Sequence, residues 1–403
     1  MILAVILLII WFFSIRRDIS FSNSPFLFAY SKVWLSLLVL GVLAISFGYD
    51  VYFLRKGYDT VINKMLLLAI SSVILSLLVK RDNLRLGSWN PSLDIYLRVL
   101  IIFFIFIIIY VSFSSRQIPL LYLFSDNSSL MSARFQSKFN FSGNVYLKNL
   151  IFGKLIKFTC LVAYARYLLR PNQVRRIVSI VLILFASYAE LFDGEKAPFV
   201  FLLISLAIVR FLIRGVNVGS VIKVGTLAFA AMFAFYLIIE NGSTVYLLES
   251  MFNRTALVPV AGLLLTINYF PDKIEFLHGA SFPQWIIGPF GLEHKRSARA
   301  VMEIFNPDGV ESGTAGVVNS WYQAEAFANF GFVVALISPM IIIPFLYIIR
   351  SAVSSYSRSV QVGFIAFLFF EVPYFGGFVE LLWNVKLMFI LTMAFLLSLK
   401  ISR

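Results

Sequence analysis

The chain is poor in charged residues and nearly lacks cysteine and histidine. Of its 403 residues only 13% are charged, whereas a soluble domain carries about 25%. The single cysteine, Cys160, excludes an intramolecular disulfide and a cysteine-based zinc site. The sequence contains no P-loop, dinucleotide-binding fingerprint, serine-nucleophile elbow or zinc-protease HExxH helix. These absences argue against a soluble enzyme of the common motif-bearing classes.

Apolar residues, in contrast, are abundant and fall into long segments. They make up 60% of the chain, and the mean hydropathy is +0.89. A helix needs about 20 apolar residues to cross a bilayer, because its backbone polar groups must be satisfied within the helix. The composition therefore predicts an all-α polytopic membrane protein of about eleven transmembrane helices in a single integral membrane domain, 1–403. The predicted spans lie near 1–15, 25–48, 61–79, 95–113, 149–169, 177–192, 197–213, 222–240, 323–349, 360–379 and 382–399.

Positive charge falls on alternate connections between these segments. With eleven spans, the most basic connections share one side, which the positive-inside rule assigns to the cytoplasm. The N-terminus is then outside, the C-terminus inside, and the net charge of +14 is a topology signal instead of a nucleic-acid footprint. The residues concerned are Arg16, Arg17, Lys80, Arg81, Arg85, Arg170, Arg175, Arg176, Arg214, Lys223, Arg350, Arg358, Lys400 and Arg403.

Two long segments then face outward, at about 114–148 and 241–322. Within the second, the apolar stretch Thr255–Phe270 is interrupted by Pro259 and Gly262. We expect a re-entrant or interface-lying helix there, although composition alone leaves a further span open.

Both outward segments contain basic residues, against the usual bias. Guanidinium groups bind phosphate through paired hydrogen bonds, and lysine supplies a compact charge for the same purpose. An outward cavity lined by such basic residues would suit a lipid-linked phosphate or pyrophosphate. Contact with lipid headgroups or pairing with nearby acidic residues is the simpler alternative. The residues predicted to line this cavity are Arg134 of the first segment, Lys196 at the short outward turn 193–196, and Arg254 and Arg299 of the second segment.

Candidate acid–base groups lie on the same side. His278 precedes an aromatic run, and a histidine near its ordinary pKa is a plausible base. Glu325 lies at the beginning of a predicted span, where a carboxylate needs a partner. The pair Asp193 and Glu195 could hold a divalent cation, but Lys196 beside it suits a helix end equally well.

The order of these features resembles a known family. Phe252-Asn253-Arg254 opens the second long segment, Phe276-Leu277-His278-Gly279 follows, and Ala324-Glu325-Ala326-Phe327-Ala328-Asn329-Phe330-Gly331 opens a long span. Gly194-Glu195-Lys196 precedes another membrane helix. This arrangement is similar to the O-antigen or oligosaccharide repeat-unit polymerases of the Wzy type.

The resemblance implies a fold similar to the GT-C glycosyltransferases, with both long loops in the periplasm of a bacterial inner membrane. It implies polymerisation of undecaprenyl-pyrophosphate-linked repeat units into O-antigen or capsular polysaccharide, without metal or other cofactor. Partners implied are the lipid-linked glycans, membrane lipids and a chain-length regulator of the Wzz type. His278 and Glu325 would then be catalytic, and Arg134, Lys196, Arg254 and Arg299 would bind the pyrophosphate.

Two alternatives remain open. An O-antigen ligase would use the same chemistry with a different acceptor. A flippase or transporter of lipid-linked oligosaccharide would favour charged residues inside the helix bundle.

Overall fold

A computed structural model describes most of the chain, and every regular element in its described part is helical. The described residues are 2–16, 29–49, 59–78, 87–122, 130, 132–134, 136–137, 140–215, 219, 222–227, 229–230, 233, 249, 252–253, 257–311, 315–372, 374 and 376–399. The chain divides into two compact units, each assembled from three separate stretches. Unit 1 comprises Met1–Asn83, Glu249–Ile349 and Val372–Asn384, and unit 2 comprises Leu84–Leu248, Arg350–Glu371 and Val385–Arg403.

Within the described residues, four helices are long and apolar enough to cross a membrane. They are Ala29–Ser46, Leu93–Ser114, Ala197–Arg214 and Phe378–Ser398, and a bent pair, Tyr322–Ile337 with Pro339–Ser354, adds a fifth if it counts as one span. Three further helices are apolar but shorter: Ile2–Arg16, Val61–Leu77 and Val260–Tyr269. These properties are those of an all-helical membrane protein, as the composition predicts.

Unit 1 is built around buried aromatic side chains. The hydroxyl groups of Tyr30 and Tyr322 lie 3.0 Å apart, and the rings of Tyr30 and Tyr374 each stack with Trp321 and also contact one another. All four side chains are almost fully buried. A buried tyrosine needs a hydrogen-bond partner for its hydroxyl group, and Tyr30 and Tyr322 provide each other's. The cluster thereby joins three stretches of unit 1 that are far apart in sequence. The helices of unit 1 are α1 (Ile2–Arg16), η1 (Ala29–Trp34), α3 (Leu35–Ser46), α4 (Asp59–Leu78), α12 (Val258–Tyr269), α13 (Gln284–Ile287), η5 (Gly288–Phe290), α14 (Ser297–Phe305), α15 (Pro307–Glu311), α16 (Tyr322–Ile337), α17 (Pro339–Ser354) as far as Ile349, and α19 (Phe378–Leu382).

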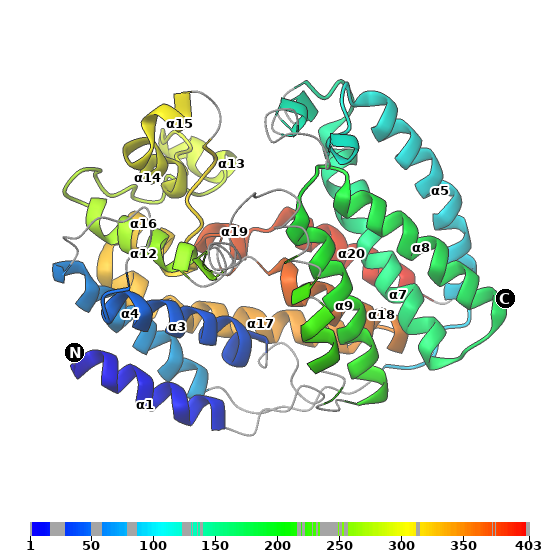
Figure 1. Cartoon of the computed structure of the whole chain (residues 1–403), viewed down its shortest axis with the longest axis horizontal. Coiled ribbons are helices and arrows are strands. Elements are labelled where there is room, and N and C mark those ends of the chain that lie inside the picture. The colour runs from blue at the N-terminus through cyan, green and yellow to red at the C-terminus, as the bar shows by residue number, and fades with distance from the viewer. Residues whose placement is uncertain are drawn as a thin grey trace. The chain divides into compact units, whose positions relative to one another are not determined.

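Unit 2 is a bundle around α7 (Ile156–Leu169), which η3 (Leu147–Leu155) runs into directly. Figure 1 shows α7, α8 and α9 side by side, and short turns reverse the chain between them. Gly363 of α18 lies against the backbone of Val162 in α7, so the two helices approach closely. The other elements of unit 2 are α5 (Leu93–Ser114), η2 (Pro119–Tyr122), α8 (Gln173–Leu191), α9 (Lys196–Arg214), α18 (Arg358–Glu371) and α20 (Val385–Ser398).

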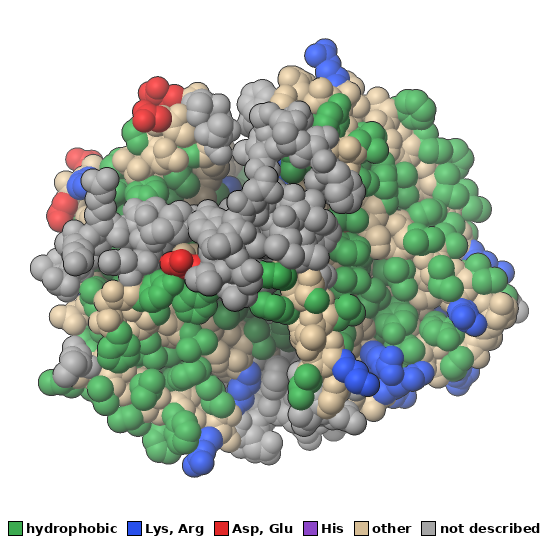
Figure 2. Space-filling view, in the orientation of Figure 1, with side chains coloured by type: hydrophobic (Ala, Val, Ile, Leu, Met, Phe, Trp, Pro, Cys, Tyr) green, Lys and Arg blue, Asp and Glu red, His purple; other side chains and the backbone are tan. Residues whose placement is uncertain are grey.

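The outer surfaces of these helices are apolar. Figure 2 shows hydrophobic side chains along the visible flank of α5 and α8, while Lys and Arg side chains gather towards the end of α9 and the α7–α8 turn. On α5, Val99, Ile102, Phe106 and Phe113 are each more than half exposed. An apolar patch of this kind on a soluble monomer would be a liability, whereas it is the surface that lipid covers.

Two predicted spans have different bounds in the structure. The segment 323–349 forms two helices, α16 and α17, bent by 78°. Gly331 has a non-helical backbone inside α16, and α17 starts with Pro339, a residue suited to a first helical position because the N–H it lacks would have no partner within the helix there. The segment 360–379 is helical only as far as Glu371, and the predicted turn at 380–381 lies inside α19. The segment 222–240 falls largely outside the described residues.

The stretch Thr255–Phe270 contains α12, which is buried on nearly all sides. A helix lying in the interface exposes one polar face, so this burial favours the re-entrant alternative. Its 12 residues give a helix of about 18 Å at 1.5 Å per residue, well short of the roughly 30 Å hydrocarbon core.

Candidate functional site

In unit 1 a loop of the second long segment is fixed to the first turns of α16. Asn329 makes the attachment: its side-chain oxygen accepts from Gly279 N at 3.1 Å, and its nitrogen donates to Ser281 Oγ at 3.1 Å and Glu325 O at 2.8 Å. Two backbone bonds add to it, from His278 N to Asn329 O and from Leu277 N to Ala328 O. A buried amide with these partners is well satisfied, so it orders the loop against the helix.

His278 has a left-handed backbone, with φ at 47°, and Gly279 follows with φ at 93°. Such a conformation costs a residue other than glycine on the order of 1–3 kcal/mol and persists where surrounding contacts impose it. Here the bonds to α16 impose it. The His278 side chain is exposed.

Glu325 lies one helical turn before Asn329 and is 7% exposed. Its Oε2 accepts from Val379 N at 2.7 Å, and a Cβ placed on Gly377 would lie 2.5 Å from that oxygen. The carboxylate is therefore held against the start of α19, where any side chain larger than hydrogen at position 377 would displace it. Close by in sequence, Glu380 accepts from Arg296 at 2.8 Å.

The structure thus places the loop that contains His278 against the turns of α16 that bear Glu325. The backbone N–H of His278 donates to Asn329 O, and the Asn329 side chain donates to the backbone carbonyl of Glu325. The carboxylate faces α19, whereas the imidazole is exposed.

The four predicted pyrophosphate-binding residues are divided. Arg299, in unit 1, donates to the carbonyls of Ala315 and Gly316 and pairs with Glu303 at 3.3 Å. Arg254 and the side chain of Lys196 lie outside the described residues. Arg134, in unit 2, donates to Gly194 O, and so reaches the turn that precedes Lys196.

That turn in unit 2 is covered by the first long segment. Lys148 Nζ lies 3.1 Å from Asp193 Oδ1 and 3.0 Å from Ser137 Oγ, and Ser137 donates to the same carboxylate oxygen. Asp193 is therefore engaged by a cation and a hydroxyl. In the described part of the chain no group of three or more acidic, histidine or cysteine side chains is arranged to hold a metal.

Further into unit 2 lies a buried ion network that the sequence analysis overlooked. Lys157 Nζ is 2.8 Å from Glu371 Oε1 and 3.6 Å from Glu190 Oε2, while Lys154 Nζ is 2.6 Å from Glu371 Oε2. Lys157 is 2% exposed and lies near the middle of the helix that η3 and α7 form together. The signal was in the sequence, because a lysine or glutamate inside a predicted span is rarely there without a role.

Comparisons of the chain with known protein families, curated proteins and solved structures find no match.

Proposed function

We propose that this protein is a bacterial inner-membrane glycosyltransferase that polymerises lipid-linked oligosaccharide repeat units on the periplasmic face. In this proposal about eleven spans form a GT-C-like architecture, and the long segments 114–148 and 241–322 are periplasmic loops. The substrates are glycans on undecaprenyl pyrophosphate, and a chain-length regulator is a partner.

One observation carries the proposal: Asn329 joins the His278–Ser281 loop to the helix turn that bears Glu325. In the proposed topology this loop lies outside the membrane and Glu325 begins an apolar helix, so the two would share one site. Substrates with a glycan in water and a lipid anchor in the bilayer would be held at such a border, and alignment of two bound reactants lowers the barrier to their reaction.

The proposed chemistry is displacement at an anomeric carbon. A hydroxyl of the acceptor glycan attacks that carbon, a new C–O bond forms, and the bond to pyrophosphate breaks with its electron pair leaving on the pyrophosphate. Glu325 or His278 accepts the hydroxyl proton. Cationic side chains of unit 1, for which Arg254 and Arg299 are candidates, stabilise the charge on the leaving group. Transfer of this kind proceeds without a metal.

The buried network of Lys154, Lys157, Glu190 and Glu371 favours a second candidate, a transporter of lipid-linked oligosaccharide. Charged groups inside a membrane bundle are typical of proteins that move ions or substrates through it. The two functions predict that an inactive protein leaves the lipid-linked repeat units in different leaflets of the membrane.

The test is elongation of purified lipid-linked repeat units by the protein in detergent, a reaction that a transporter cannot perform. We expect Glu325→Gln to lower the rate by about 10²–10⁴, the range for loss of a general base. Glu275→Gln is the matched control, since Glu275 is exposed on the same long segment and should react at the parental rate.

In cells, the Glu325→Gln variant should leave single repeat units on the outer leaflet. Repeat units confined to the inner leaflet would support the transporter instead. Long polymer at parental rates from well-expressed Glu325→Gln and His278→Ala variants would contradict the proposed catalytic roles.

A further inference from the structure

Unit 2 contains a cavity lined by arginine side chains, formed where α5 begins, α7 ends and α8 begins. It is partly open to solvent and has a volume of about 210 Å³, which leaves room for a phosphate group. Three guanidinium groups and one carboxylate line it, from Arg98, Arg166, Arg175 and Asp94. We call it the arginine cavity.

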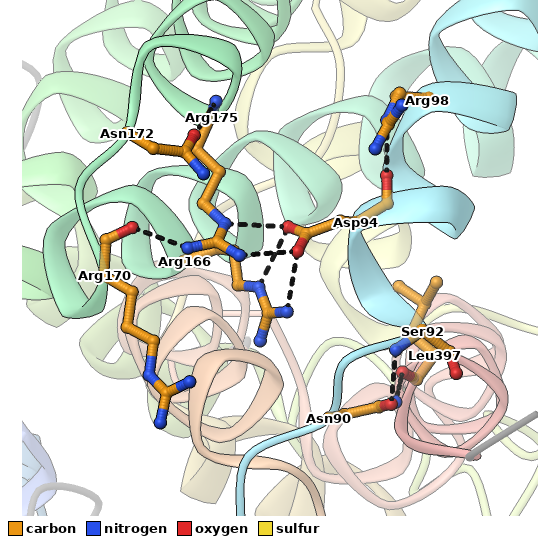
Figure 3. A network of polar contacts seen from close by, with 9 residues as sticks. All are labelled: Asn90, Ser92, Asp94, Arg98, Arg166, Arg170, Asn172, Arg175 and Leu397. Atoms are coloured by element: carbon orange, nitrogen blue, oxygen red, sulfur yellow. Dashed lines mark hydrogen bonds and ion pairs between the residues drawn. The ribbon is translucent and has the colours of Figure 1, made fainter.

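Asp94 ties the three helices together. Arg166 of α7 donates to it at 3.0 and 2.9 Å, and Arg175 of α8 donates at 3.0 and 2.8 Å. Figure 3 shows both guanidinium groups turned towards this one carboxylate, while Arg98 donates to the Asp94 backbone carbonyl. The lone carboxylate is thus shared between two arginines, and the Arg98 charge adds to a local surplus of positive charge.

Three guanidinium groups lie around the aromatic ring of Trp89. The guanidinium carbons of Arg166, Arg170 and Arg175 lie 3.2, 4.2 and 5.2 Å from the centre of its ring. An aromatic face attracts cations, but three of them around one ring repel one another. An anion in the cavity would relieve this repulsion.

Arg166 also retains an unused donor. The residue is 1% exposed, and its Nη1 makes no hydrogen bond to any described part of the chain. A buried donor without a partner is costly. The first turn of α8 lies at the same wall, because Asn172 caps it by accepting from Arg175 N at 2.7 Å, and a helix start adds partial positive charge.

We propose that the arginine cavity binds a phosphate group. Guanidinium groups match phosphate oxygens in pairs, and basic pockets between helices at a membrane surface bind anionic headgroups. The phosphate belongs either to an anionic lipid headgroup or to a soluble phosphate. This inference is independent of glycosyl transfer.

The test is calorimetric titration of the full chain in neutral detergent. The probes are inorganic phosphate and dihexanoyl phosphatidylglycerol, with dihexanoyl phosphatidylcholine as the reference lipid. The variants are Arg98→Gln and Arg175→Gln, each of which removes one guanidinium group from the cavity lining; matched thermal unfolding of parent and variants would verify that folding is preserved. Arg214→Gln, at the exposed end of α9 and outside the cavity lining, is the control.

We expect each cavity variant to weaken binding by about tenfold or more, the effect of losing one charge-assisted contact. Arg214→Gln should bind as the parent does. Binding of phosphatidylglycerol alone supports a lipid headgroup as the ligand, and binding of inorganic phosphate, with or without the lipid, supports a soluble phosphate group. If neither probe binds more tightly than phosphatidylcholine, or if Arg214→Gln weakens binding as much as the cavity variants do, the proposal is overturned.

Discussion

At the scale of single residues, Lys157 is a buried charge that lies outside the proposed active site. Its ammonium group is buried between Glu371 and Glu190. Removing one partner of a buried ion pair costs about 3–5 kcal/mol, because the remaining charge is left uncompensated. We therefore expect Lys157→Met to be strongly destabilising, with a lower midpoint of thermal unfolding in detergent.

Lys223→Met is the control, since Lys223 is exposed and such changes usually stay within about 0.5 kcal/mol. Equal midpoints for the two variants would show that the network contributes nothing to stability. A stable Lys157→Met protein that had lost activity would instead assign the network a functional role.

The contacts of single residues could be predicted from the sequence less completely than the helices could. Glu325 and His278 could be selected because a carboxylate in a span and a loop histidine stand out. Asn329, which joins them, could not, because its importance depends on a contact between segments about 50 residues apart. The same holds for Asp94, whose two arginine partners come from other helices.

At the scale of elements, the crossing of α7 and α18 depends on Gly363. A Cβ there would lie 2.8 Å from Val162 N and 2.9 Å from Val162 Cα, both backbone atoms that cannot move aside. We expect Gly363→Ala to destabilise the protein by about 1–3 kcal/mol, as overpacking does, despite alanine's better helix propensity. Thermal unfolding of purified protein measures this.

Gly225→Ala provides the comparison, because a Cβ at that helical position would meet no described atom within 4 Å. It should be neutral or stabilising by up to about 1 kcal/mol. A similar loss of stability in both variants would place the effect in the helix backbone instead of the crossing.

Most helices were predictable from apolar length alone, including α4, α5, α8 and α9 within a few residues. The bend between α16 and α17 was not located, although Gly331 and Pro339 stand in the sequence. Membrane helices tolerate both residues when neighbouring groups satisfy the backbone, so their presence alone does not fix a break.

At the scale of the whole molecule, the basic connections predict a topology. Reporter fusions after Lys148 and after Arg403 should give periplasmic and cytoplasmic readouts respectively, because positive charge keeps connections inside. A cytoplasmic readout from the first or a periplasmic one from the second would contradict both the orientation and the outer placement of the proposed site.

The interleaving of the two units constrains their biogenesis. Unit 1 needs residues up to Asn384, although its first stretch ends at Asn83. At roughly 5–20 residues per second, the earliest helices wait on the order of 15–60 s for partners such as α16 and α19. During that interval the hydroxyl groups of Tyr30 and Ser72, which later bond to Tyr322 and Gln323 of α16, must be accommodated by lipid, by water or by an insertion chaperone. Slowing translation after residue 83 should therefore lengthen the time during which the incomplete unit 1 can be cleaved by membrane proteases.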